Sequence, residues 1–217
     1  MSLMLNINRR WVLLVVLLLL SGCTTLKKSV PLSDTEKKLR WQKNKQQILK
    51  INNWQLAGRL GLLVPGQSGS VSLLWIQEND TYTLSIDGPF GLSLVHIKGN
   101  SAGVTAEISG EEQPLKSMSP EDLMMQITGW DLPVSGLKYW VRGLPTPDFK
   151  SKVTFNNEGQ TSIIDQGGWI ITYESYRDEK SVSLPARMKV NSDKISLKLI
   201  IKDWQLHLPE VIEGTGK

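Results

Sequence analysis

Side chains that could carry out catalysis are few and scattered in this 217-residue chain. The two histidines, His96 and His207, lie far apart in strand-like segments. The segment 66–70 around Ser68 is similar to a serine nucleophile turn, but it lacks the last glycine of that motif and no helix follows it. The sequence contains no zinc-ligand cluster, phosphate-binding loop or dinucleotide fingerprint. We therefore expect no enzymatic activity, no bound metal and no cofactor.

Cys23 is the one residue whose surroundings predict a chemical modification. Two arginines and a ten-residue apolar run lead to Leu20, Ser21 and Gly22, which directly precede it. This pattern is typical of a bacterial lipid-attachment signal: a peptidase cuts before the cysteine, the thiol takes diacylglycerol, and the freed amine takes a third acyl chain. The apolar run is shorter than the ~20 residues of a membrane-spanning helix. A plain signal peptide with an incidental cysteine is the alternative.

This signal divides the chain into three segments. We expect residues 1–22 to be removed as a signal peptide, residues 23–32 to form an acylated tether, and residues 33–217 to fold as a single domain. Because Cys23 is the only cysteine, no internal disulfide can form. Burial alone must therefore stabilise the fold.

Positive charge is concentrated next to the predicted lipid anchor. Residues 24–50 carry eight lysines and arginines against Asp34 and Glu36, whereas acidic residues outnumber basic ones from residue 51 onward. Attraction to anionic lipid headgroups would explain this distribution, and so would a solvated helix face. Nucleic-acid binding is not expected, because the chain carries an export signal and its body is acidic.

A helix followed by a long meander of strands is the predicted order of elements. Ser33 and Glu36 form a capping box, which predicts a helix reaching residue 51. Apolar and polar residues then alternate with a period of two, and short polar turns separate the segments. Such turns require antiparallel neighbours. The predicted strands span residues 54–62, 71–75, 82–86, 92–98, 103–109, 161–165, 169–175, 186–190 and 195–204.

Two helices interrupt this meander. Ser119 and Pro120 start the first, which ends at Gly129, and the second spans residues 135–142 before Gly143. The acidic pair 121–122 fits a helix-capping role better than acid–base catalysis. Two inserted helices can cover only one face of a sheet, so a strongly twisted sheet around them would leave an apolar hollow.

Seven tryptophans remain after removal of the signal, and several lie on one face of the predicted strands. They either fill the core or line a cavity for acyl chains, and the sequence leaves both interpretations open. A register slip of one residue would reverse every strand assignment. The candidate cavity residues are Leu60, Leu62, Leu73, Trp75, Leu84, Ile86, Leu94, Leu123, Ile127, Trp140 and Trp169.

One connection between strands is unusually apolar. Gly88, Pro89, Phe90 and Gly91 join two predicted strands, with the aromatic ring at the tip. The turn geometry needs glycine and proline but no aromatic side chain. An exposed ring would indicate contact with a membrane or a partner. Alternatively, Phe90 folds back over the core.

The motifs taken together resemble the LolB family of outer-membrane lipoproteins, over nearly the whole chain. The resemblance rests on the Cys23 signal, Trp41, residues 54–60, the loop 88–91, residues 132–133, the string 137–145 and residues 202–204. It implies an α+β fold, a half-open antiparallel β-barrel of about eleven strands, capped by three helices and enclosing an apolar cavity. Residues 205–217 extend beyond the pattern and receive no role.

The resemblance also implies a non-catalytic transfer function. The protein would accept acylated lipoprotein cargo from a LolA-like periplasmic carrier and insert it into outer-membrane phospholipid, with Phe90 at the inserting tip. It would act as a monomer, anchored through Cys23 at the periplasmic face of the outer membrane. Thr24 fits this location, because aspartate after the cysteine is the common retention signal. A lipid- or glycolipid-binding periplasmic module on the same scaffold is the alternative, and an esterase is a third.

Overall fold

The computed structural model describes residues 31–64 and 67–207. The predicted signal peptide, Cys23, most of the tether and residues 208–217 lie outside these described residues. The described residues from Leu32 onward belong to one compact unit. Within the described residues, no helix has both the length and the apolarity that crossing a membrane requires.

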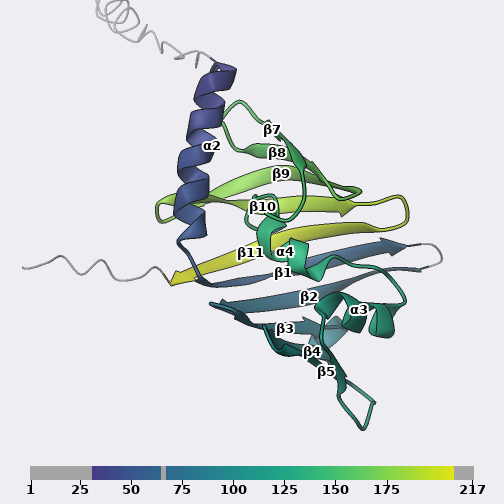
Figure 1. The fold of residues 1–217 in the computed structure, drawn as a ribbon. Helices are drawn as coiled ribbons and strands as arrows, with labels where there is room; N and C mark the ends of the chain where they lie inside the picture. Colours follow the sequence, from purple (N-terminus) through teal and green to yellow (C-terminus); the bar gives the residue numbers. More distant parts are fainter. Residues whose placement is uncertain (1–30, 65–66, 208–217) are drawn as a thin grey trace, which may run out of the picture. The chain divides into compact units, whose positions relative to one another are not determined.

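Eleven strands form one antiparallel sheet in the order β6-β5-β4-β3-β2-β1-β11-β10-β9-β8-β7 (Figure 1). The first and last long strands of the chain, β1 and β11, pair at its centre. The two end strands, β6 and β7, do not pair with each other, so the sheet remains open. The predicted meander and half-open barrel are confirmed. The strands are β1 (Asn53–Val64), β2 (Gln67–Glu78), β3 (Thr81–Asp87), β4 (Ser93–Asn100), β5 (Gly103–Ile108), β6 (Leu115–Ser117), β7 (Ser151–Phe155), β8 (Thr161–Gln166), β9 (Trp169–Glu179), β10 (Val182–Asn191) and β11 (Ser196–His207).

Large apolar side chains of the core share one face of the sheet, which we call the inner face. Leu56 lies opposite Trp75 on one side and Trp204 on the other. Leu84 lies opposite Trp75 and Ile97. Cross-strand partners in an antiparallel pair point to the same face, so the inner face is continuous across the sheet. It extends further through Leu199, Met188, Tyr173, Ile171 and Ile164.

Three helices cover part of the inner face: α2 (Asp34–Leu49), α3 (Pro120–Thr128) and α4 (Val134–Trp140) (Figure 1). The predicted caps are confirmed, because Ser33 forms a capping box with Glu36 and Ser119 caps α3. Gly129 ends α3 in the left-handed conformation, with φ 74°. A short 3-10 helix, η1 (Pro89–Gly91), forms the loop between β3 and β4.

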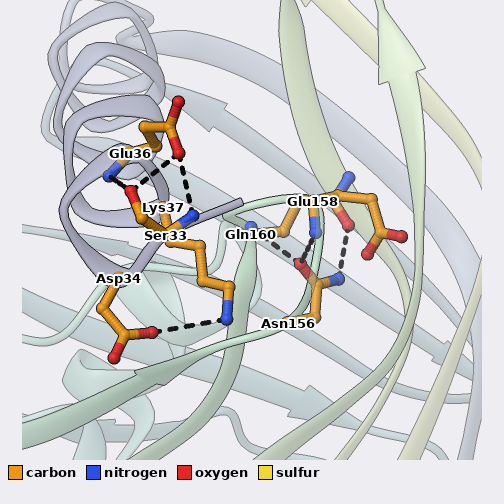
Figure 2. A network of polar contacts seen from close by, with 7 residues as sticks. All are labelled: Ser33, Asp34, Glu36, Lys37, Asn156, Glu158 and Gln160. Atoms are coloured by element: carbon orange, nitrogen blue, oxygen red, sulfur yellow. Dashed lines mark hydrogen bonds and ion pairs between the residues drawn. The ribbon is translucent and has the colours of Figure 1, made fainter. Parts of the chain in front are cut away.

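Polar contacts attach α2 to the β7–β10 half of the sheet. Figure 2 shows the capping box beside the β7–β8 turn, where Asn156 Oδ1 accepts from the backbone nitrogens of Glu158 and Gln160 at 3.0 and 2.9 Å. Gln160 Nε2 in turn donates to Ser183 Oγ at 2.8 Å. Further along α2, Asn44 exchanges two hydrogen bonds of 3.0 Å with the backbone of Ser183. The Asn44–Ser183 pair therefore holds the helix to β10 in addition to apolar packing.

Sequence patterns missed two strands and predicted several others too short, among them β2, β9 and β10. The end strands β6 and β7 have three and five residues, too few for a clear alternation. The expected strand 186–190 begins earlier, at Val182, because a register shift after Pro185 lets the chain continue through the proline. Its partner β9 extends to Glu179, because the longer β10 provides backbone hydrogen-bond partners as far as Val182.

The backbones of β1 and β11 approach closely at Gly58, which leaves no room for a side chain there. Gly58 lies at the register shift between β1 and β11, and a Cβ atom there would overlap the backbone oxygen of Ile200. We expect Gly58→Ala to lower the free energy of unfolding by about 1–3 kcal/mol, measured by urea unfolding. The matched control is Gly69→Ala in β2, where a Cβ meets nothing within 4 Å, so the free energy should stay level or rise slightly. Equal losses in both variants would contradict this account of the bulge.

Candidate functional site

A cavity of about 620 Å³ opens between the inner face and the segments that cover it. Its walls come from β2, β3, the start of α3, the α3–α4 connection, α4, the loop after α4 and the β8–β9 turn. This volume is within the ~300–1,000 Å³ of typical ligand pockets. Aromatic rings form much of the wall: Trp75, Tyr82, Tyr139, Trp140, Phe149 and Trp169.

A buried amide, Gln166, holds one side of the cavity. Its Oε1 accepts from Trp140 Nε1 at 3.1 Å and from the backbone nitrogen of Thr146 at 2.9 Å. Its Nε2 donates to the carbonyl oxygens of Thr146 and Phe149 at 2.9 and 2.8 Å. One side chain thus joins the end of β8 to α4 and to the segment 146–149. Sequence analysis missed this role, although a glutamine at an inner-face position of a strand was the available signal.

A second buried amide, Gln77, joins backbone and indole groups in the part of the cavity wall formed by β2 and β3. It accepts from Trp75 Nε1 at 3.4 Å and donates to the carbonyl oxygens of Asn79 and Thr81 at 2.8 and 3.0 Å. These bonds close the β2–β3 turn and fix the ring of Trp75. Both amides are buried with their oxygen and nitrogen paired, so neither carries a desolvation penalty for an unmade bond.

Four charged residues line the same cavity: Glu121, Asp131, Lys138 and Asp148. Glu121 Oε1 accepts from the backbone nitrogen of Ser135 at 2.8 Å, which connects the first turns of α3 and α4. Burial lowers the pKa of Lys138, and the nearby Arg142 adds to this effect, while Asp80 opposes it. Burial raises the pKa of Tyr82 to about 12, and the charge of Glu121 contributes to the rise. The negative charge of Glu121 therefore acts on Tyr82, one of the aromatic residues that line the cavity.

Arg142 connects α4 to the segment that follows α2. The side chain is 6 % exposed and donates to the carbonyl oxygens of Lys138 and Ile51 at 3.0 and 3.4 Å. Its guanidinium carbon lies 5.7 Å from the ring centroids of both Trp54 and Tyr139. Burial lowers its pKa to about 10, so it keeps its charge at neutral pH. Two aromatic faces and two carbonyls thus stabilise the cation that ties α4 to the end of α2.

The structure divides the eleven candidate cavity residues into four groups. Trp75, Trp140 and Trp169 line the cavity. Leu73, Leu84 and Leu123 are buried in the core. Leu60, Leu62, Ile86 and Ile127 are partly buried and pack against that core. Leu94 lies apart: it follows a register shift, is 39 % exposed, and contacts the loop at Gly88.

The Phe90 loop projects from the sheet. Gly88 N donates to Leu92 O at 2.8 Å, which closes a tight loop around η1. Phe90 is 102 % exposed, so the ring does not fold back over the core. Its φ of 60° and ψ of 20° lie in the left-handed region, which is unfavourable for a bulky residue. An exposed ring on a strained backbone is better explained by an external contact than by local stability.

Comparison with solved structures supports the architecture. The fold is similar to a domain from Vibrio parahaemolyticus assigned to outer membrane lipoprotein sorting, with TM-score 0.53 and 8 % identity, over 78 % of this chain and 93 % of that one. It is also similar to a DUF1329 family protein from Desulfovibrio piger, with TM-score 0.54 and 6 % identity, over 80 % and 91 %. At such low identity the likeness concerns the fold alone.

Relatives found by sequence share far more identical residues with this chain than these solved structures do. The family model described as "Outer membrane lipoprotein LolB" matches residues 52–204. The outer-membrane lipoprotein LolB of Pseudomonas putida (strain GB-1) is 34 % identical over 197 residues, which covers 91 % of this chain and 96 % of that protein. Its counterpart in Pseudomonas paraeruginosa is 37 % identical over 189 residues, which covers 87 % and 92 %. The chain therefore belongs to the LolB family of outer-membrane lipoproteins.

Proposed function

We propose that this protein accepts acylated lipoproteins from a LolA-like periplasmic carrier and inserts them into the outer membrane. The observation that carries the proposal is the aromatic-walled cavity on the inner face, in a chain of the LolB family. A cavity of this kind binds hydrocarbon without forming or breaking bonds, so the transfer requires no catalytic group.

Acyl chains would enter the cavity beside Trp75, Trp140 and Trp169. Each buried methylene contributes ~0.8 kcal/mol, so even partial insertion of one fatty chain gives substantial affinity. The half-buried aliphatic residues Leu60 and Ile86 lie on the same inner face, nearer the end of the strands that carries the Phe90 loop. They would provide apolar surface along which a chain passes between cavity and membrane.

Burial of hydrocarbon also sets the direction of transfer. Cargo would leave the carrier for this cavity because its chains are better buried here, and would leave the cavity for the bilayer because burial there is more complete. Each step lowers the free energy, so this stage needs no nucleotide hydrolysis.

Phe90 would act at the membrane surface. The loop presents one fully exposed aromatic ring, beside the exposed Leu92. Aromatic rings partition favourably into the interface between headgroups and acyl chains. Acylation of Cys23 would hold the domain at the periplasmic face of the outer membrane as a monomer, so the loop would meet phospholipid repeatedly without a further partner.

Replacement of the exposed ring tests the role of the loop. We expect Phe90→Glu to leave folding and cargo acceptance intact but to slow the insertion of cargo into liposomes, because a carboxylate resists entry into apolar surroundings. The control is Met118→Glu, which adds the same charge to an exposed apolar residue at the opposite end of β4 and β5. An unchanged insertion rate in Phe90→Glu, measured by cargo flotation with liposomes, would rule out the loop as the inserting element.

Removal of the lipid anchor tests the cavity. The Cys23→Ala chain, exported behind a cleavable signal, should still take cargo from a carrier complex in a detergent-free mixture, because the binding surface lies within the folded domain. Transfer is measured by co-purification of cargo with the variant. Loss of cargo binding in this soluble form would mean that the cavity is not the binding site. Free lipid retained without any lipoprotein exchange would favour the lipid-binding module instead.

A further inference from the structure

Four basic side chains gather on the outer face of the sheet, the face opposite the three helices. They are Arg59 of β1, Arg187 and Lys189 of β10, and Lys198 of β11, on three strands that are neighbours in the sheet (Figure 1). Lys189 lies directly opposite Lys198, and Ile200 lies opposite both Arg59 and Arg187. Cross-strand partners point to the same face, so the four side chains form one cluster, which we call the basic patch.

The basic patch carries more positive charge than its surroundings neutralise. Glu174 of β9 pairs with it, at 2.6 Å from Lys189 Nζ and 3.9 Å from Arg187 Nε. The hydrogen bond from Lys189 lowers the pKa of this carboxyl, and the charges of the neighbouring cations add to the effect. In the part of the chain that the structure describes, no acidic group lies within 4.0 Å of Arg59 or Lys198. Like charges placed directly opposite each other destabilise a sheet, so this arrangement favours an anionic partner from outside the chain.

The basic patch lies at the end of the sheet that carries the Phe90 loop. Arg59 lies opposite Ser72, which in turn lies opposite Asp87 at the end of β3, so Arg59 is level with the base of the loop. Lys198 lies two residues further toward this end of the sheet. The strands β3 and β10 are four places apart, which is about 20 Å at the usual strand spacing. A single surface can therefore meet the loop and the patch together.

An exposed leucine extends this end of the outer face. Leu63 lies on β1 four residues beyond Arg59 and is 61 % exposed. With Phe90 and Leu92 it gives this end of the sheet an apolar tip. At ~3.3 Å per residue, Lys198 and Arg59 lie about 7 and 13 Å behind Leu63. An apolar tip that enters a bilayer by ~5–10 Å would place these cations among the lipid phosphates.

The opposite side of the Phe90 loop is acidic. The turn between β5 and β6 carries the exposed Glu111 and Glu112, and it lies beside the start of β4, where Ser109 N donates to Leu94 O at 3.0 Å. An anionic surface would repel this turn and attract the basic patch. The distribution of charge about the loop therefore favours one orientation of the domain over its reverse.

We propose that the basic patch binds the headgroups of anionic phospholipids while the Phe90 loop enters the membrane, so that the domain tilts with the outer face of β1, β10 and β11 toward the bilayer. This inference rests on the proposed function, since it assumes that the loop meets the membrane. The apolar tip beside the patch is the reason for a lipid surface as partner, because an acidic protein would need no apolar group at that depth. In this orientation the inner face turns toward the periplasm, where its cavity stays accessible to a carrier.

Binding to vesicles of two compositions tests the patch. The protein is the soluble Cys23→Ala chain, and the vesicles contain phosphatidylcholine with or without about 30 % phosphatidylglycerol. We expect the parent chain to bind the anionic vesicles about tenfold more tightly than the neutral ones, measured by co-sedimentation. Arg59→Gln with Lys198→Gln should weaken binding to the anionic vesicles about 5- to 20-fold and leave binding to the neutral ones unchanged.

The matched control removes two lysines elsewhere on the outer face. Lys98→Gln with Lys116→Gln changes the net charge equally, at exposed positions of β4 and β6 away from the Phe90 loop. Affinity for anionic vesicles should then change by less than about twofold, because salt screens charges that lie further from the membrane than ~10 Å. Equal losses in the two double variants, or equal binding of the parent to both kinds of vesicle, would overturn the inference.

Cargo transfer separates this inference from the proposed function. Both double variants should take cargo from a carrier complex as the parent does, because neither changes the cavity. Loss of cargo acceptance in the Arg59, Lys198 variant, with binding to anionic vesicles retained, would assign the patch to an acidic protein instead. Failure of the patch to bind lipid leaves the proposed function standing, whereas normal cargo insertion by Phe90→Glu would contradict the role of the loop whatever the patch binds.

Single fluorescent labels test the tilt. Because Cys23 is the only cysteine, the Cys23→Ala chain accepts one introduced cysteine without competing labels. Ser68→Cys places an environment-sensitive nitrobenzoxadiazole label opposite Leu63 on the outer face, and Ser109→Cys places it in the acidic turn. With anionic vesicles, the emission of the first label should rise and shift to the blue, while the second stays as in buffer. Equal responses from the two positions would contradict the proposed orientation.

Discussion

One-sided burial is the constraint on which the rest of the structure depends. The strands place their large apolar side chains on a single inner face, and the three helices cover only part of it. A two-layer domain normally buries such a face completely. Here the remaining gap becomes a cavity, because the helices do not fill it and an open sheet cannot close on itself. The functional site is thus a direct consequence of an incompletely covered sheet.

Buried polar groups keep that gap open without destabilising its walls. Gln77 and Gln166 pair their amide groups with backbone and indole partners on opposite sides of the cavity. Satisfied amides are rigid attachment points, whereas unpaired ones would favour collapse or water entry. Arg142, just after α4, is also a satisfied buried polar group. Aromatic faces and carbonyl oxygens surround its cation in place of a counter-ion. The shape of this cavity therefore depends on well-placed polar contacts.

Charged side chains and exposed apolar surface occupy separate places in this arrangement. The exposed Phe90 concentrates hydrophobicity at one point on the rim of the sheet. The carboxylates lie at the cavity, which the rings of Trp140 and Trp169 also line. The exposed aromatic ring and the charged side chains at the cavity therefore lie at different places in one small domain.

Local patterns in the sequence determined most of the elements. Capping residues located α2 and α3, alternation located the long strands, and glycine with proline located the loop that exposes Phe90. The lipid attachment at Cys23 stays a prediction, since it lies outside the described residues. Only the tertiary structure decided which residues line the cavity. Gln166, Thr146 and Phe149 come together through contacts between segments about twenty residues apart, and Arg142 reaches Ile51 across 91 positions. Such contacts depend on how helices cover the sheet, and no local periodicity encodes that.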